Sequence, residues 1–270
     1  MQSYNNEFLD QQAKKIRNLS IQTIGKFGVG HLGGSVSIAE VLSAIYFDLA
    51  NVNPQNPKWA DRDRVVLSKG HAGTALYCAL ALKGYFPLEV LDTLNKNGTT
   101  LPSHCDMNKT IGVDMTAGSL GQGLSAAVGM AIAGKIDKKS YSVYCIVGDG
   151  ECQEGQIWEA AMLAGSRKLN NLIVFVDNNK MQIDGETKEI NNIEPIDEKF
   201  KSFGFDVVRI DGHNAGLISE TVKKMKNNND KPIAVILETV KGKGVDFCEG
   251  KVSSHSVTMT EEMWKKAIKE

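Results

Sequence analysis

The residues best suited to chemistry are a carboxylate and an amide, each placed just after an apolar run. Asp149, flanked by two glycines, follows the run 141–147, and Asn179 follows the next such run, 171–177. Both side chains offer hard oxygen atoms, and Mg²⁺ is typically held by one or two carboxylates together with substrate phosphates. One strand–helix–strand unit would put both oxygens at neighbouring strand ends. The spacing therefore predicts a diphosphate anchored through Mg²⁺, in preference to a tight turn and an unrelated loop asparagine.

Competing phosphate-binding patterns are missing from the sequence. The Gly-Lys pairs that begin at Gly25, Gly134 and Gly250 are not followed by serine or threonine, so they do not complete a P-loop. No GxGxxG pattern opens a helix after a predicted strand, which removes the fingerprint of a dinucleotide fold. The metal-anchored diphosphate remains the favoured chemistry.

Elements of alternating type must position these residues. Five short apolar runs are predicted to be strands: 64–68, 141–147, 172–176, 205–210 and 233–237. Helices are predicted at about 6–26, 37–49, 71–82, 118–134 and 154–168, with another before each of the last two strands. Such alternation predicts an α/β fold, with a parallel sheet covered by helices on both faces. Ligands of these folds bind at the carboxyl ends of the strands. The glycine-rich loops fall at those ends, and we expect one domain over residues 1–270.

Two local features refine this prediction. The segment from Ser37 to Glu40 has the spacing of a capping box, in which serine and glutamate side chains satisfy the first backbone groups of a helix. It is expected to open a helix that runs to about Leu49. The segment 95–117 is polar and irregular, and a loop of that length in a compact domain is usually functional or disordered.

Composition excludes several classes of function. The chain has 31 basic and 32 acidic residues, a net charge of −1, and no long run of like charge. A non-specific nucleic-acid surface is therefore not expected. No apolar stretch is long enough to span a bilayer, and the first residues lack a secretory core. The five cysteines are scattered and odd in number, which is typical of free thiols in a reducing cytoplasm.

The segments around the carboxylate and the amide resemble the thiamine-diphosphate motif of transketolases. The resemblance covers Gly148-Asp-Gly-Glu-Cys-Gln-Glu-Gly-Gln-Ile-Trp-Glu-Ala160 and Asp177-Asn-Asn-Lys180. Other matching segments occur in the order typical of the family, from about residue 15 to 257: Gly30-His-Leu-Gly-Gly34, Asp63-Arg-Val-Val-Leu-Ser-Lys-Gly-His71, Gly118-Ser-Leu-Gly-Gln-Gly123, Ile210-Asp-Gly-His-Asn214 and Lys241-Gly-Lys-Gly244. Leu32 and Ser119 stand where many relatives have proline, a change that affects loop rigidity and not the metal site.

The resemblance implies a role for each matching residue. Thiamine diphosphate and Mg²⁺, for which Ca²⁺ or Mn²⁺ can substitute, would be the cofactors. The implied metal ligands are Asp149, Asn179 and the backbone carbonyl of Met181. The implied cofactor-binding residues are Asp149, Asn179, His71, Gly118, Leu120, Gly150, Ile183 and His255. The implied catalytic residues are His31, His104, His255 and Glu154. Glu154 belongs to a proton relay between paired cofactors, and Glu159 would lie with it at a subunit interface.

The histidines are also informative by position. His31, His71 and His104 each lie beside glycine or in the irregular loop, where strand ends should converge, so we expect them to line the pocket. Histidine suits substrate contacts because it donates or accepts a proton near neutral pH. The surroundings of His255 lack the tryptophan and glycine usual in the family. We interpret His213 as structural, closing a turn after a strand.

Three further residue types are interpreted as structural or left open. Trp158 is expected to anchor a helix to the core, and Cys152 to be a small packed residue. Lys241 and Lys243 could meet a phosphate or lie in a solvated glycine loop, and the sequence leaves both alternatives open.

The function implied by the resemblance is that of the N-terminal, diphosphate-binding subunit of a split transketolase. A two-carbon ketol unit would pass from a ketose or ketose phosphate to an aldose. The activating glutamate of the family belongs to a pyrimidine-binding half, so a C-terminal partner subunit is expected, in a two-plus-two heterotetramer active only when assembled. Two alternatives remain: a subunit of a related thiamine enzyme, such as a deoxyxylulose-phosphate synthase or a 2-oxoacid dehydrogenase, or a non-catalytic cofactor-binding relative. The histidine set favours transketolase.

Overall fold

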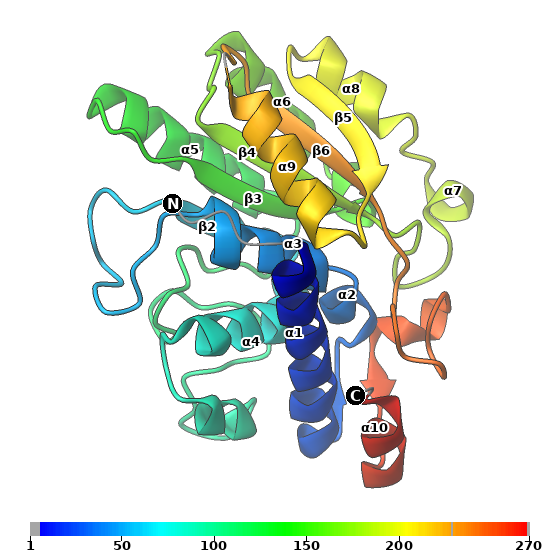
Figure 1. Ribbon diagram of the computed structural model, residues 1–270. Coiled ribbons are helices and arrows are strands. Elements are labelled where there is room, and N and C mark those ends of the chain that lie inside the picture. The colour runs from blue at the N-terminus through cyan, green and yellow to red at the C-terminus, as the bar shows by residue number, and fades with distance from the viewer. Residues whose placement is uncertain (1–5, 228, 269–270) are drawn as a thin grey trace.

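A five-stranded sheet forms the centre of the molecule. The computed structural model describes residues 6–227 and 229–268. The strands lie in the order β2 (Arg64–Leu67), β3 (Val143–Gly148), β4 (Leu172–Asn178), β6 (Ile233–Glu238) and β5 (Asp206–Asp211), and every neighbouring pair is parallel. Helices cover both faces of this sheet (Figure 1). The predicted α/β fold class is therefore confirmed.

The central strands are apolar on both sides because both of their faces are buried. Alternate residues of a strand point to opposite faces of the sheet. In β3, Tyr144 and Ile146 pack into one hydrophobic cluster, whereas Val143, Cys145 and Val147 pack into a second. This continuous burial explains why these strands read as unbroken apolar runs.

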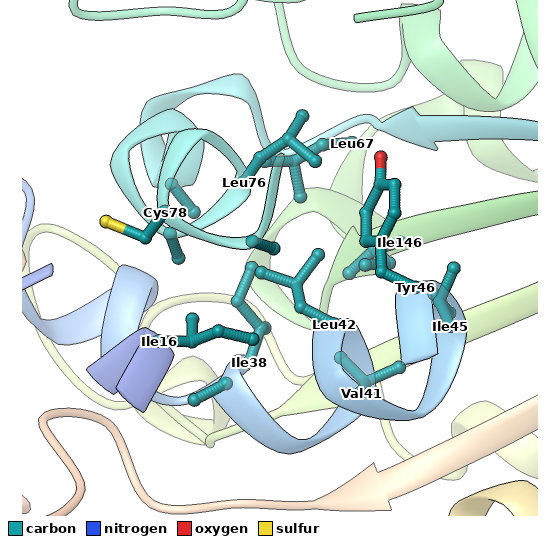
Figure 2. Close-up of a cluster of buried hydrophobic side chains, with 14 of the residues drawn as sticks. Ile16, Ile38, Val41, Leu42, Ile45, Tyr46, Leu67, Leu76, Cys78 and Ile146 are labelled. Carbon is teal, nitrogen blue, oxygen red and sulfur yellow. The ribbon is translucent and has the colours of Figure 1, made fainter. Parts of the chain in front are cut away.

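A hydrophobic cluster covers one face of the sheet and includes residues of several helices. Among them are α1 (Asn6–Phe27), α3 (Ala39–Ala44), α4 (Gly73–Lys83) and α9 (Ala215–Lys226). Figure 2 shows part of this cluster, in which Ile16, Leu42 and Leu76 from three helices gather near Ile146 of β3. Burial of each such side chain contributes about 1.5–3 kcal/mol to folding.

The other face is covered by α5 (Gln122–Ile136), α6 (Gly155–Ser166) and α8 (Ile196–Ser202). Trp158 of α6 packs against Phe200 and Phe203, with ring centroids 5.2 and 6.2 Å away, and its Nε1 donates to the Cys152 carbonyl at 2.8 Å. Cys152 itself is fully buried. The interpretations of Trp158 as a core anchor and of Cys152 as a packed residue are confirmed.

Shorter elements complete the fold around one edge. An antiparallel pair, β1 (Val29–Gly30) with β7 (Val257–Thr258), joins segments that are far apart in the sequence. Short helical elements occupy the following ranges: α2 (Gly33–Val36), Gly70–Ala72, Leu88–Thr93, Gly150–Gln153, α7 (Thr187–Ile190), Val252–His255 and α10 (Glu261–Ala267). The β1–β7 pair brings the loop after Gly30 beside the segment that ends at His255.

The predicted capping box does not form. The Ser37 hydroxyl donates to the Asp177 carboxylate at 2.8 Å, and α3 begins at Ala39 without a side-chain cap. The Glu40 carboxylate accepts a hydrogen bond from the Arg17 guanidinium, and its second oxygen lies 3.3 Å from His213 Nδ1. The prediction was wrong because a buried carboxylate, distant in sequence, competes for the serine. After α3 the chain continues as a π-helix, Ile45–Leu49.

The segment 95–117 and the five cysteines have the character that the sequence predicts. The segment 95–117 contains turns and bends but neither helix nor strand, as predicted. All five cysteines are free and buried. Within residues 6–227 and 229–268, no helix is both long enough and apolar enough to cross a bilayer.

Candidate cofactor and active site

Loops from four adjacent strands converge on one pocket of about 330 Å³. Lys69 and His71 follow β2, Asp149 follows β3, Asn179 follows β4, and Lys241 follows β6. The pocket is lined by His31, Gly34, Lys69, His71, His104, Gly118, Leu120, Gly148, Asp149, Gly150, Glu151, Gln153, Glu154, Asn179, Met181, Gln182, Ile183, Asp184, Lys241 and His255. Every residue that the sequence predicted for metal, cofactor or catalysis is in this set.

The predicted metal ligands lie together because β3 and β4 are paired in register. Gly148 of β3 is aligned with Asp177 of β4, so the residues that follow each strand are neighbours. The Asp149 carboxylate accepts hydrogen bonds from the backbone N–H of Gly150, at 2.7 Å, and from that of Lys180. Burial, together with the charge of Asp177, raises the pKa of Asp149 to about 7. A bound cation would compensate this buried carboxylate.

Asn179 presents its amide between the strand end and the next loop. Its Nδ2 donates to Asp177 at 2.9 Å, and its Oδ1 accepts from the backbone N–H of Met181 at 3.1 Å. The amide oxygen therefore lies on the same side as Met181, the third predicted ligand. The sheet register alone accounts for the approach of Asn179 and Asp149.

Asp177 is a fully buried carboxylate beneath these ligands. It accepts hydrogen bonds from Lys69 Nζ at 2.5 Å, from Ser37 Oγ at 2.8 Å and from the Thr239 hydroxyl, besides that from Asn179. Burial acts to raise its pKa, but the Lys69 ammonium and the donated hydrogen bonds hold it below the usual value. Asp177 is therefore ionised at neutral pH.

Two buried lysines supply positive charge to the pocket. Lys69 and Lys241 are each 2% exposed. Lys241 Nζ lies 3.2 Å from His255 Nδ1, and burial together with the charge of Lys69 lowers the pKa of Lys241 to about 8. Lys241 is therefore not solvated and lines the pocket, whereas Lys243 pairs with Glu249 at 3.4 Å and is 39% exposed.

Four histidine rings form a cluster beside these lysines. The ring of His31 lies 5.5 Å from those of His71 and His104 and 5.3 Å from that of His255, and His71 lies 5.1 Å from His255. Burial and the nearby Lys69 lower the pKa of His71 to about 2, and burial and Lys241 lower that of His255 to about 4. Burial and His104 also lower the pKa of His31. These three rings are neutral at pH 7, each with one donor and one acceptor nitrogen.

His213 lies outside this cluster, as predicted. Its Nε2 accepts from the backbone N–H of Val240 at 2.8 Å, and its Nδ1 faces Glu40 at 3.3 Å. Both contacts join segments of the scaffold, and His213 is not among the residues that line the pocket. Its interpretation as a structural histidine is confirmed.

Two residues that shape the pocket, Glu151 and Lys69, were not predicted from the sequence. Glu151 is buried, accepts from the backbone N–H of Gly121 at 2.8 Å and from that of Gly148 at 3.0 Å, and also receives the Ser68 hydroxyl. It thereby ties the glycine loop of α5 to the end of β3. Glu151 could have been predicted from its position close to Asp149, just after an apolar strand. Lys69 has the equivalent position after β2.

Small residues allow close approach at two points of the wall. A Cβ added to Gly34 would lie 3.2 Å from His71 Nε2 and 3.3 Å from Lys69 Nζ, and one added to Gly70 would lie 2.3 Å from the Ala117 carbonyl. Any other residue type would displace these groups. At the mouth, Ile183 is 65% exposed.

Comparisons with known proteins agree with this site. The family profile described as "Transketolase, thiamine diphosphate binding domain" matches residues 9–270. Over 262 residues the chain is 60% identical to the 6-deoxy-6-sulfo-D-fructose transketolase subunit SqwG of Clostridium sp. (strain MSTE9), covering 97% of this chain and 95% of that protein. It is 40% identical over 264 residues to an apulose-4-phosphate transketolase subunit of Phocaeicola vulgatus, covering 98% of this chain and 94% of that protein.

Among solved structures, transketolase from Campylobacter jejuni matches with a TM-score of 0.91 and 35% identity, over 98% of this chain and 42% of that one. The chain belongs to the transketolase family and corresponds to its thiamine-diphosphate-binding domain. Its extent matches relatives that are named as separate subunits, and it spans less than half of the solved transketolase chain. The prediction of an N-terminal, subunit-type transketolase half is confirmed.

Proposed function

We propose that residues 1–270 act as one domain that binds thiamine diphosphate through Mg²⁺, with Ca²⁺ or Mn²⁺ as substitutes. The observation that carries the proposal is the convergence of hard oxygen ligands and buried lysines at four parallel strand ends. Asp149, Asn179 and the Met181 carbonyl would hold the metal. A carboxylate, an amide and a carbonyl are the oxygen donors that Mg²⁺ prefers.

The residues around the metal ligands fit a diphosphate. Lys69 and Lys241 are buried basic groups of the pocket, and Gly150 also lines it. His71 would lie against the diphosphate, Gly118 and Leu120 beside the aminopyrimidine, and Ile183 near the thiazolium. When bound, thiamine diphosphate supplies the carbon nucleophile of ketol transfer.

The histidines would handle the sugar. His31, His104 and His255 lie within one cluster at the pocket wall, beside the proposed cofactor groups. The rings of His31 and His255 are neutral at pH 7, so each can donate to a hydroxyl or carbonyl oxygen while its second nitrogen accepts a proton. We propose that the three orient the ketose donor and move protons at its oxygens.

The donor is proposed to be a ketose with an anionic group at its far end. The two similar subunits are named for 6-deoxy-6-sulfo-D-fructose and for apulose 4-phosphate, which carry a sulfonate and a phosphate. At 60% identity, the sulfonated ketose is favoured for this chain. The reaction would move a two-carbon ketol unit to an aldose.

A C-terminal, pyrimidine-binding subunit would complete the site in a two-plus-two heterotetramer. Exposed residues near the pocket support this proposal. Glu154 and Ile183 line the pocket and are exposed. On α6, Met162 and Leu163 are apolar side chains that are 57% and 42% exposed. Glu154 would join a proton relay at this interface, with Glu159 nearby. A cytoplasmic location is proposed, supported by the five free thiols.

Removal of the Asp149 carboxylate tests the proposed metal site. Asp149→Ala is expected to abolish the Mg²⁺-dependent part of thiamine-diphosphate binding, because no other described pocket carboxylate can replace it in register with Asn179. Calorimetric titration of the cofactor with and without Mg²⁺ measures this effect. Asp184→Ala, which alters an exposed pocket aspartate, is the matched control and should bind as wild type does. Equal Mg²⁺ dependence in Asp149→Ala and wild type would rule out the metal assignment.

A further inference from the structure

Asp177 is not one of the proposed metal ligands, but its carboxylate accepts hydrogen bonds from four side chains around the pocket. It lies near the end of β4, fully buried, and receives hydrogen bonds from Lys69, Ser37, Thr239 and Asn179. These donors belong to four separate segments of the chain. Its carboxylate therefore joins the segments that carry the pocket floor.

The chemistry of this contact determines which way the Asn179 amide faces. An ionised carboxylate can only accept hydrogen bonds, and an asparagine side chain has one donating and one accepting end. The amide nitrogen must therefore face Asp177, at 2.9 Å. The amide oxygen is then left on the outer side, where it accepts from Met181 N–H. A reversed amide would place an N–H group where a metal ligand is needed.

Asp177 also forms a buried ion pair with Lys69. The lysine ammonium lies 2.5 Å from the Asp177 carboxylate, and Lys69 also lines the pocket. A buried charged group is stabilised only when it is paired and hydrogen-bonded. Asp177 thus holds a cation at the base of the pocket, close to Gly34 and His71.

We propose that Asp177 is a positioning residue for metal binding, acting by presenting the amide oxygen of Asn179 to the cation. The inference rests on the proposed function, since it requires the metal to bind at Asn179. It assigns to Asp177 no contact with metal or substrate. Groups that orient metal ligands from behind typically change metal affinity about 10–100-fold when they are altered.

Two substitutions at Asp177 separate orientation from charge. Asp177→Ala removes the acceptor and lets the Asn179 amide turn. Asp177→Asn retains a carbonyl oxygen that can face Lys69 and Asn179, because its own amide nitrogen can donate to the Thr239 hydroxyl. Asp177→Ser retains a polar group in the buried space and replaces the alanine variant if that variant does not fold.

The measurement is the Mg²⁺ dependence of thiamine-diphosphate binding by the full chain, followed by calorimetry with and without the metal. The Mg²⁺-linked gain in affinity should fall about 10–100-fold in Asp177→Ala and stay within a few-fold of wild type in Asp177→Asn. Binding of the cofactor without metal should change far less. Circular dichroism and thermal midpoints report on the fold.

A matched control is available at Asp48, a buried carboxylate outside the pocket. It pairs with Lys223 at 2.6 Å and accepts from Ser219, so its contacts resemble those of Asp177. Asp48→Ala should lower the thermal midpoint without changing the Mg²⁺-linked gain. Wild-type Mg²⁺ dependence in folded Asp177→Ala, or equal losses in the alanine and asparagine variants, would overturn the inference. Absence of Mg²⁺ dependence in the wild type would instead contradict the proposed function.

Discussion

At the scale of single residues, the histidine cluster shows how the pocket sets protonation. His31, His71 and His255 lie within 5.5 Å of one another by ring centroid, with Lys69 and Lys241 nearby. A second positive charge in this space is unfavourable, and burial removes the water that would stabilise it. All three rings have lowered pKa values, and so remain neutral while the lysines carry the charge.

We expect His31 and His104 to act on the substrate and not on the cofactor. His31→Ala and His104→Ala should each lower kcat and kcat/KM together by about 10²–10⁴-fold, the usual range for a lost proton-transfer group. Thiamine-diphosphate affinity should stay within a few-fold of wild type. The assay uses a ketose donor and an aldose acceptor with the assembled enzyme. Normal turnover in both variants would show that these histidines are only structural.

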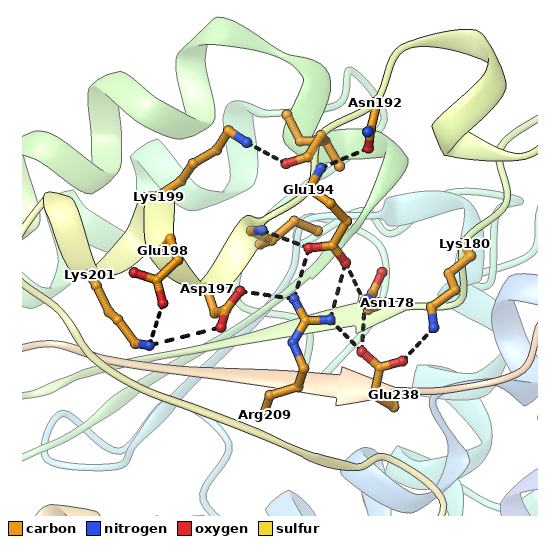
Figure 3. A network of polar contacts seen from close by, with 12 residues as sticks. Asn178, Lys180, Asn192, Glu194, Asp197, Glu198, Lys199, Lys201, Arg209 and Glu238 are labelled. Atoms are coloured by element: carbon orange, nitrogen blue, oxygen red, sulfur yellow. Dashed lines mark hydrogen bonds and ion pairs between the residues drawn. The ribbon is translucent and has the colours of Figure 1, made fainter.

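At the scale of elements, the loop between β4 and α8 carries Asn179, Met181 and Ile183. A polar network ties this loop to the sheet (Figure 3). Arg209 of β5 donates to Glu194 at 2.8 and 3.1 Å, to Asp197 at 3.0 Å and to Glu238 of β6. Glu238 also accepts a hydrogen bond from the Asn178 amide at 2.9 Å and forms an ion pair with Lys180 at 2.7 Å. Arg209 therefore ties the far end of the loop to β5 and β6, and Glu238 links the beginning of the loop to the same network.

We predict that Arg209→Ala loosens this loop. Several carboxylates would lose a shared cation in a partly exposed site, which should cost about 1–3 kcal/mol of unfolding free energy. Cofactor affinity should fall as well, because the loop carries two proposed metal ligands. Urea denaturation and calorimetry measure the two effects.

Lys201→Ala provides the control for Arg209→Ala. Lys201 pairs with Glu198 at 2.7 Å at the periphery of the same network, with 46% of its side chain exposed. Its loss should change stability far less than Arg209→Ala does, because exposed ion pairs contribute little. A stability loss in the lysine variant equal to that in Arg209→Ala would contradict the assigned role of Arg209.

At the scale of the whole molecule, the pocket opens at the carboxyl edge of the sheet, with exposed residues at its rim. The loops after β2, β3, β4 and β6 supply its floor and walls. Exposed Ile183 at the mouth, with Met162 and Leu163 of α6, is apolar surface of the kind that assembly buries.

We expect catalysis only after assembly with the proposed partner subunit. The isolated chain should show no ketol transfer, because the carboxylate that activates the cofactor would come from the partner. Titration with the partner should restore activity and saturate near equal stoichiometry. Light scattering on the purified complex should give the mass of two copies of each chain. Turnover by this chain when mass spectrometry finds no partner would contradict the proposal.

The local sequence determined the main strands and the positions of two proposed metal ligands, Asp149 and Asn179. The central strands β3, β4 and β6 are apolar runs because both of their faces are buried, so burial leaves a local signal in the sequence. Asp149 and Asn179 follow two such runs, and parallel strands in register necessarily bring their carboxyl ends together. Their spacing therefore predicts their proximity once the two strands pair side by side, as β3 and β4 do.

Tertiary structure alone decided how polar groups compete across the fold. Ser37 has the local spacing of a helix cap, but its hydroxyl bonds to Asp177, 140 positions away. Lys241 could equally have been solvated, yet the fold buries it beside His255. Neither outcome has a local signal, because a buried charge selects its partners by proximity in space and by the cost of remaining unpaired. The same cost gathers Lys69, Ser37, Thr239 and Asn179 around one carboxylate.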